Sequence, residues 1–142
     1  SLELDPAEME KRNIHLQKKY AEIEENEVRF EELHCEDAEY LIVAFGSCAR
    51  IAQKAMEMAR EEGIKVGLLR PITLWPFPSK AIAARAAQVK GILTVELNAG
   101  QMVEDVRLAV ECKVPVEHFG RLGGIVPDPD EVITALKEKL IK

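Results

Sequence analysis

Four apolar runs recur along the sequence at intervals of about 25 residues, and this spacing restricts the folds available to the chain. They begin near residues 40, 65, 91 and 114. The first, YLIVAF at 40–45, is apolar without interruption, as in a strand that is buried on both faces of a parallel sheet. Helical patterns follow the runs, and successive right-handed βα units have this period. The spacing therefore predicts a three-layer α/β/α domain with a mainly parallel sheet.

The remaining elements fit this alternation. Further strands are predicted at KVGLL, GILTVEL and PVEHF, which begin at residues 65, 91 and 115. Helices are predicted between Gly46-Ser47 and Gly63, over 79–88, over 101–110, and from Asp128, where the sequence is close to a capping box. A weaker, polar pattern at 28–35 predicts an edge strand whose direction stays open.

The N-terminal segment has a different character. DPAEMEKRNIHLQKKYAEIEE predicts a helix with Asp5 as its cap and Pro6 at its first position. Its apolar face is thin and consists of Met9, Leu16, Tyr20 and Ile23. Residues 1–39 carry a net charge of −8, which we interpret as a solvated helix rather than an acidic docking tail. We predict a helical linker arm over 1–27 and an α/β domain over 28–142.

The composition argues against several classes of protein. The sequence shows no basic face of the kind that binds nucleic acid. No apolar run approaches the ~20 residues that cross a bilayer, and no secretion signal is visible, so we expect a cytoplasmic protein. Cys35, Cys48 and Cys112 are far apart, so neither an iron–sulfur cluster nor a structural zinc site is expected.

Candidate binding residues lie beyond the carboxyl ends of the predicted strands, where open parallel sheets bind ligands. They are Ser47, Arg70, Asn98, Gly100, Gln101 and Arg121. No dinucleotide fingerprint or P-loop is complete. Structural explanations compete: a helix cap for Ser47, turn chemistry for Asn98 and Gly100, and a flexible crossing for the GRLGG segment. Gln101 has no evident structural duty, which leaves a strand-end site open.

A nucleophile at the start of the first domain helix is a weaker hypothesis. Cys48 lies in the first turn, where the helix dipole can lower a thiol pKa, but a small buried residue is the simpler interpretation. Ser47 is not in a G-x-S-x-G elbow, and no histidine is placed by the sequence to serve it.

The segment RPITLWPFPS, at 70–79, holds Trp75 and Phe77, each followed by a proline. The prolines exclude ordinary helix or strand there and stiffen the loop. Large rings on a stiff loop suit a contact with a neighbouring surface, where aromatic residues act as anchors. The alternative is that both rings fold back over their own sheet.

Three longer blocks carry a family resemblance. They are VAFGSCARIAQKAMEMAREEGIKVGLLRPITLWPFPSKAI, ILTVELNAGQMVEDVRLAV and HFGRLGGIVPDPDEV. Together they resemble the C-terminal domain of the α subunit of 2-oxoacid:ferredoxin oxidoreductases that act on 2-oxoglutarate, 2-ketoisovalerate and similar acids. The acidic helix before them is similar to the linker of that family.

The resemblance implies a transketolase C-terminal-like domain with a five-stranded mixed sheet whose first strand is antiparallel. It implies a whole enzyme that decarboxylates a 2-oxoacid on thiamine diphosphate with Mg, reduces ferredoxin through iron–sulfur clusters, and forms an acyl-CoA from coenzyme A. The partners that it implies are the β subunit, the other subunits, and an N-terminal domain of the α subunit.

This chain departs from the complete family pattern, because it has no G-D-G…N pyrophosphate motif and no cluster cysteines. We therefore expect a fragment that is inactive alone, binds no cofactor or metal itself, holds no catalytic residue, and serves the assembly of the enzyme. The alternative is a free-standing domain that binds an anion or a nucleotide at the strand ends.

Overall fold

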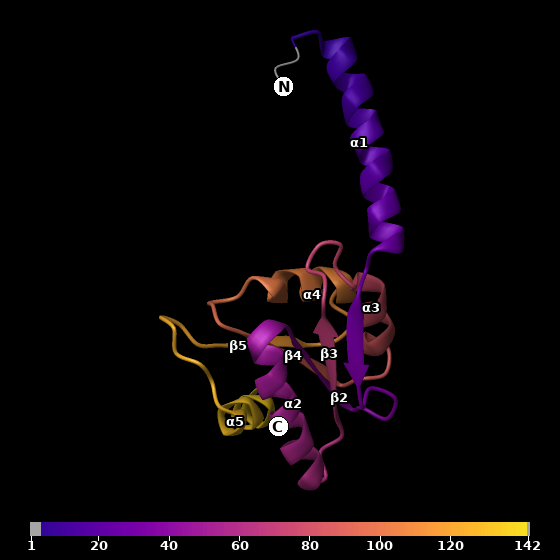
Figure 1. Cartoon of the computed structure of the whole chain (residues 1–142). Helices are drawn as coiled ribbons and strands as arrows, with labels where there is room; N and C mark the ends of the chain where they lie inside the picture. The colour runs from indigo at the N-terminus through magenta and orange to yellow at the C-terminus, as the bar shows by residue number, and fades with distance from the viewer. Residues whose placement is uncertain (1–3, 142) are drawn as a thin grey trace.

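The computed structural model describes residues 4–141, which form one α/β domain and a projecting helix (Figure 1). The order of the elements along the chain is α1 (Pro6–Asn26), β1 (Phe30–Leu33), β2 (Tyr40–Ala44), α2 (Gly46–Glu61), β3 (Val66–Pro71), α3 (Ser79–Ala86), β4 (Gly91–Glu96), α4 (Met102–Val110), β5 (Val116–Gly120) and α5 (Pro129–Leu140). The predicted alternation of strands and helices is confirmed.

The five strands form a single sheet in the order β1-β3-β2-β4-β5. The four strands from β2 to β5 are parallel, whereas β1 runs antiparallel to β3, with Phe30 opposite Pro71. This is the five-stranded mixed sheet of the prediction, with the weak first strand at an edge. Because β1 is antiparallel, its first residue lies at the edge of the sheet where the parallel strands end.

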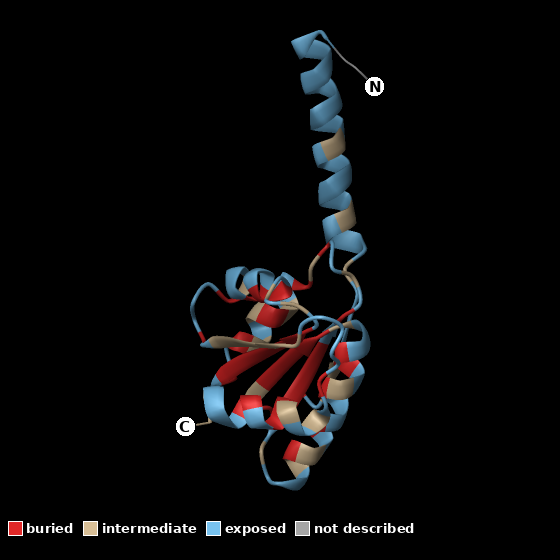
Figure 2. Ribbon diagram, turned by 90° about the vertical axis from the view of Figure 1, so that its left-hand side faces the viewer, coloured by how far each residue is buried: buried red, intermediate tan, exposed pale blue. Residues whose placement is uncertain are grey.

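Helices cover both faces of the sheet and bury its central strands (Figure 2). One core lies between the sheet and the pair α2 and α5, with Ile42, Met56 and Leu136 at its centre. The other lies under α3 and α4, with Leu41, Ile82 and Val106. Every residue of β4 is buried, as expected for a strand with neighbours on both sides and helices on both faces.

Helix α1 projects from the domain as an arm, which we define as residues 4–27 (Figure 1). None of the residues of α1 is buried, and Figure 2 shows its surface as exposed along nearly its whole length. Asp5 caps the helix by accepting the amide of Ala7, and Pro6 occupies its first turn, as predicted. The first three residues of the predicted arm lie outside the described part of the chain.

Local signals placed the start of α5 and the end of α2, whereas the start of α2 differs from the prediction. Asp128 and Glu131 form a complete capping box at the start of α5. Gly63 follows α2 with a φ of +86°, the left-handed conformation that suits glycine after a helix. The cap assigned to Ser47 is wrong: α2 begins one residue earlier, Phe45 is its cap residue, and no side chain caps it. Within residues 4–141, no helix is long and apolar enough to cross a membrane.

Candidate functional site

The loops that follow the four parallel strands gather at one edge of the sheet, which we call the carboxyl edge. They are residue 45 after β2, 72–78 after β3, 97–101 after β4 and 121–128 after β5. Strands β2 and β4 are neighbours, but the helices after them lie on opposite faces of the sheet. This is the switch in direction where open α/β sheets place ligands, so the carboxyl edge is the first candidate site.

A buried carboxylate, Glu96, lies at the centre of this edge. It is the last residue of β4, and it is only 1% exposed. Its oxygens accept the backbone amide of Met102 at 2.8 Å and that of Val103 at 3.1 Å, and the amide of Gln101 at 3.3 Å. The free N–H groups at the start of α4, where an anion would bind, are therefore already satisfied by the protein's own carboxylate.

His118 in β5 connects the same loop to the sheet. Its Nδ1 lies 3.4 Å from a carboxylate oxygen of Glu96 and 3.1 Å from the hydroxyl of Thr94, and its Nε2 lies 3.2 Å from the carbonyl oxygen of Asn98. Gly120 makes this close approach possible, because a Cβ at that position would lie 2.1 Å from the Asn98 oxygen. The cluster holds the 97–101 loop down on the edge of the sheet.

The predicted residues of this loop make turn contacts. The side-chain oxygen of Asn98 accepts the amide of Gly100 at 2.8 Å, and its side-chain nitrogen lies 3.3 Å from Glu96. Gly100 has a φ of +119°, which other residues rarely adopt. Gln101 is exposed, with only its backbone amide engaged in the cluster. Turn chemistry thus accounts for Asn98 and Gly100 in full.

Neither Ser47 nor Cys48 is placed as an activated nucleophile. Ser47 is exposed in the first turn of α2. Cys48 is 4% exposed, and its burial, together with the charge of Glu96, raises the pKa of its thiol. The sequence left open whether the helix dipole lowers this pKa. The structure favours the other alternative, a buried thiol that stays protonated.

The two candidate arginines are engaged inside the domain. Arg121 donates to a carboxylate oxygen of Glu131 at 2.7 Å and thereby extends the capping box of α5. Arg70 lies on β3 and pairs with Glu31 of β1 at 3.2 Å, in register across the sheet. The structure does not bring either guanidinium together with Ser47 and Gln101 as an anion site.

The carboxyl edge is nearly free of charge. Its loops, 21 residues in all, contain two charged residues, Arg121 and Asp128, and both bind within the α5 cap. The loops at the opposite edge, at 34–39, 62–65, 87–90 and 111–115, contain eight charged residues in 19. Burying charged groups away from water costs free energy, so the desolvation of the carboxyl edge costs less than that of the opposite edge.

Exposed apolar side chains gather on the same edge. Of the 13 large hydrophobic residues that are exposed in the described chain, seven lie in these loops, and most of the others lie on the arm. The seven are Ile72, Leu74, Trp75, Leu97, Leu122, Ile125 and Val126. Contiguous apolar surface on a soluble domain marks an interaction site.

The two aromatic residues of the 72–78 loop have different surroundings. Phe77 is half-buried and packs against the core under α3 and α4, which is the folded-back alternative. Trp75 is 56% exposed, and its ring meets that of Tyr20 on the arm edge to face, with centroids 5.8 Å apart. Since Met9, Leu16 and Ile23 share the helix face of Tyr20, the apolar face of the arm is turned toward the carboxyl edge.

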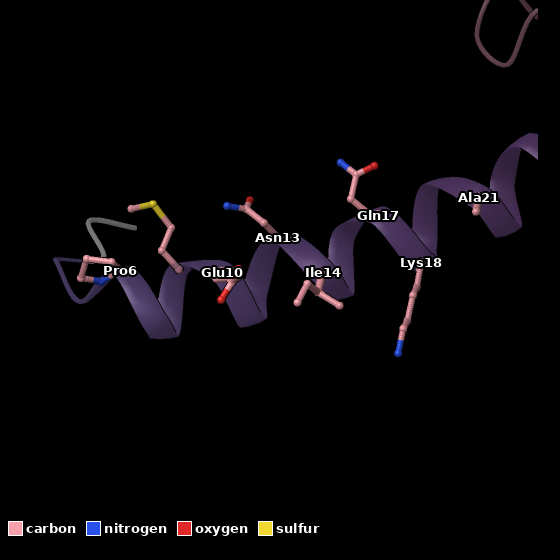
Figure 3. A pocket seen from close by; sticks show the side chains of 8 residues that line it. Pro6, Glu10, Asn13, Ile14, Gln17, Lys18 and Ala21 are labelled. Atoms are coloured by element: carbon pink, nitrogen blue, oxygen red, sulfur yellow. The ribbon is translucent and has the colours of Figure 1, made fainter.

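A second stretch of the arm presents a mixed surface. Figure 3 shows side chains that project from α1 in more than one direction, among them Gln17 and Lys18, and all of them come from this single helix. No other described element lies opposite them, and no residue of α1 is buried. Since most helical stability in proteins comes from the packing of one face, the unpacked face of the arm is available for contact with another surface.

These observations decide what the carboxyl edge can do chemically. A phosphate or pyrophosphate needs free N–H donors or cations; at this edge Glu96 occupies the donors of α4 and Arg121 is paired with Glu131, whereas no side chain caps the start of α2. Among residues 4–141, no group of three or more His, Cys, Asp or Glu side chains is placed to hold a metal ion. The apolar, charge-poor loops of this edge suit contact with another protein surface.

The fold has close counterparts among solved structures. A split-gene transketolase, described as an inactive β4 tetramer, superposes with a TM-score of 0.68 at 21% identity over 80% of this chain, which shows the transketolase-like fold. The 2-oxoglutarate:ferredoxin oxidoreductase of Magnetococcus marinus superposes with a TM-score of 0.82 at 26% identity, over 97% of this chain and 24% of that one. That structure contains 2-oxoglutarate, coenzyme A and succinyl-CoA.

The sequence itself matches the model of the pyruvate:ferredoxin oxidoreductase core domain II over residues 38–132. The chain belongs to this family. It is also 46% identical over 138 residues to the ketoisovalerate oxidoreductase subunit VorB of Methanothermobacter marburgensis, a match of 97% of this chain. The chain spans 39% of the length of that relative. The predicted resemblance to a subunit domain of the 2-oxoacid:ferredoxin oxidoreductases is thus confirmed.

Sequence reasoning underrated Glu96 and His118. Both were visible, since Glu96 interrupts an apolar strand just before a glycine turn and His118 lies in the last strand. What no local pattern gives is that β4 and β5 are neighbours, in register from Ile92 and Val116 to Glu96 and Gly120. That register places the two side chains together.

Proposed function

We propose that this chain is the assembly domain of the α subunit of a 2-oxoacid:ferredoxin oxidoreductase and is not catalytic alone. The proposal rests on the carboxyl edge, which is apolar and nearly uncharged, and where Glu96 occupies the donors at the start of α4. Charge-poor apolar patches with aromatic residues are typical of the cores of protein interfaces. The family match and the names of the relatives supply the enzyme class.

In this proposal, the whole enzyme oxidatively decarboxylates a 2-oxoacid to an acyl-CoA and reduces ferredoxin. Thiamine diphosphate, Mg, coenzyme A and the iron–sulfur clusters belong in this proposal to the other parts of the enzyme; among residues 4–141, no group of three or more His, Cys, Asp or Glu side chains is placed to hold a metal ion. The partners of the edge and the arm are the N-terminal domain of the α subunit, the β subunit and the other subunits; ferredoxin meets the assembled complex.

The edge is tested by substitutions that remove exposed apolar surface without touching the core. Trp75→Ala combined with Ile125→Ser should weaken the complex with the co-expressed remaining parts of the enzyme by about tenfold or more, because both side chains are more than half exposed in this domain. Leu108→Ser is the control, since Leu108 is 79% exposed on α4, away from the edge. Analytical ultracentrifugation measures the affinity.

Equal affinity of the double variant and the wild type would contradict the role of the edge. A separate assay addresses catalysis: the purified 142-residue chain should not oxidise any 2-oxoacid, whereas the assembled complex should reduce ferredoxin. Turnover by the chain alone would overturn the proposal. Calorimetry with coenzyme A and thiamine diphosphate tests the ligand-binding alternative.

A further inference from the structure

A groove lies at the foot of the arm, where α1 meets the domain. Its volume is about 700 Å³. The wall on the arm side carries Glu24 and Glu25, and the wall on the domain side is the end of the 72–78 loop with the first residues of α3. Val28 and Phe30 line the groove between the two walls. The groove thus joins the arm to the carboxyl edge.

The aromatic part of this groove is open to water. Trp75 is 56% exposed and Phe30 is 39% exposed, although each is large enough to bury well over 100 Å² in a core. Tyr20 meets the Trp75 ring edge to face and thereby holds one side of the indole. An ordered aromatic surface of this kind offers its other atoms to an incoming side chain.

The acidic wall has no ion-pair partner among residues 4–141. Glu24 and Glu25 lie in the last turns of α1, where the helix dipole already disfavours negative charge, and the last turn holds no basic residue. In the part of the chain that the structure describes, neither carboxylate takes part in an ion pair. Lys80, across the groove, is the one base among the described lining residues and lies beyond ion-pair distance of both.

We propose that this groove docks a basic segment of a partner polypeptide within the oxidoreductase, with an Arg or Lys side chain laid on Trp75 and its charge between Glu24 and Glu25. This inference rests on the proposed function and specifies the chemistry of one contact. Arginine fits best, because its guanidinium stacks on aromatic faces and pairs with carboxylates. The contact supplies the positive charge that the arm lacks at its carboxyl end.

Charge reversal on one helix tests the contact. Glu25→Lys should weaken the assembled complex about tenfold, and Glu24→Lys with Glu25→Lys should weaken it further, since each places a like charge against the partner's base. Glu22→Lys is the matched control: it makes the same change in the same final turns and has the same effect on the helix dipole, but Glu22 does not line the groove. Affinities of the complex at low and high salt are compared by ultracentrifugation.

Each outcome separates this inference from the proposed function. If the complex forms and the Glu25 and Glu22 variants behave alike, the groove contact is wrong and the assembly role stands. If the wild-type chain does not assemble with the other parts of the enzyme, both are wrong. The salt sensitivity of assembly should also fall in Glu24→Gln/Glu25→Gln; an unchanged salt dependence overturns the inference.

A photo-crosslink identifies the occupant directly. Benzoylphenylalanine at position 80, in place of Lys80 on the rim, should join the chain to a partner peptide that contains Arg or Lys, read by mass spectrometry of the assembled complex. A crosslinked peptide without a base overturns the inference. So does a crosslink to a second copy of this chain.

Discussion

At the scale of single residues, the most consequential side chain is one that never reaches the surface. Glu96 carries its charge at 1% exposure because three backbone amides at the start of α4 and the side-chain amide of Asn98 surround it. A buried charge is tolerated only when it is well hydrogen-bonded, and the helix dipole adds to its stability. The same residue that occupies the anion-binding donors of α4 therefore fixes helix α4 to strand β4.

Replacing Glu96 should cost stability rather than a catalytic function. We expect Glu96→Ala to lower the free energy of unfolding by about 3 kcal/mol, because several buried N–H groups lose their acceptor. Glu96→Gln, which keeps one acceptor oxygen, should cost less. Urea unfolding measures both, with Glu104→Gln in the exposed first turn of α4 as the control. A Glu96→Ala variant as stable as the control would contradict this account.

The three cysteines differ in burial and therefore in the expected reactivity of their thiols. Burial raises the pKa of the Cys35 thiol to about 11, and burial raises that of Cys48 as well, whereas Cys112 is exposed. Ellman's reagent at pH 8 should therefore titrate one thiol in the folded chain and three in urea. Cys112→Ser should remove the fast reaction. A second fast thiol in the folded protein would show that one buried site opens.

At the scale of elements, the edge strand β1 is attached by charge. Arg85 of α3 donates to both carboxylate oxygens of Glu32, at 2.8 and 2.7 Å, and both side chains are about three-quarters buried. The Arg85 hydrogen bonds hold the pKa of Glu32 below its ordinary value. The pair thus links the weak antiparallel strand to the helix layer.

This pair predicts a pH dependence of stability with a definite sign. Since the folded-state pKa of Glu32 is lowered, its contribution is present above the ordinary pKa of 4.5 and is lost as the pH falls through the folded value. Glu32→Gln should be about 1 kcal/mol less stable than the wild type at pH 7. That difference should shrink as the pH falls below 4.5 and through the lowered folded-state pKa of Glu32. A difference that is independent of pH in urea unfolding would contradict the assignment.

At the scale of the whole molecule, the arm and the domain differ in how much apolar surface they bury. The arm meets the domain at the ring contact of Tyr20 with Trp75, and none of the residues of α1 is buried, while two cores stabilise the sheet and its helices. An L-shaped surface results, with the apolar face of the arm and the carboxyl edge as its two limbs (Figure 1). We propose that 1–27 and 28–142 are separate units on this basis.

Removing the arm tests that division. Residues 28–142 alone should unfold cooperatively, with a free energy of unfolding within about 1 kcal/mol of the full chain, because little apolar area is lost from either core. The arm should contribute to assembly instead. A truncated domain that fails to fold, or loses several kcal/mol in urea unfolding, would show that the arm belongs to the domain.

The sequence by itself determined the features that depend on local periodicity. Uninterrupted apolar runs specify buried strands, the 25-residue spacing specifies βα units, and Asp5 and Asp128 mark helix starts, because caps and periodicities act within a few residues. The longer blocks were enough to identify the family, which the match over residues 38–132 confirms.

Only the tertiary structure decided how the strand ends are used. Whether Arg121 binds a ligand depends on Glu131, and whether the start of α4 is free depends on Glu96, since an anion site exists only where donors lack partners. The exposure of Trp75 and the burial of Phe77 likewise depend on which residues lie beside each ring after folding. Such outcomes are properties of neighbours that are distant in the chain, which a local pattern does not contain.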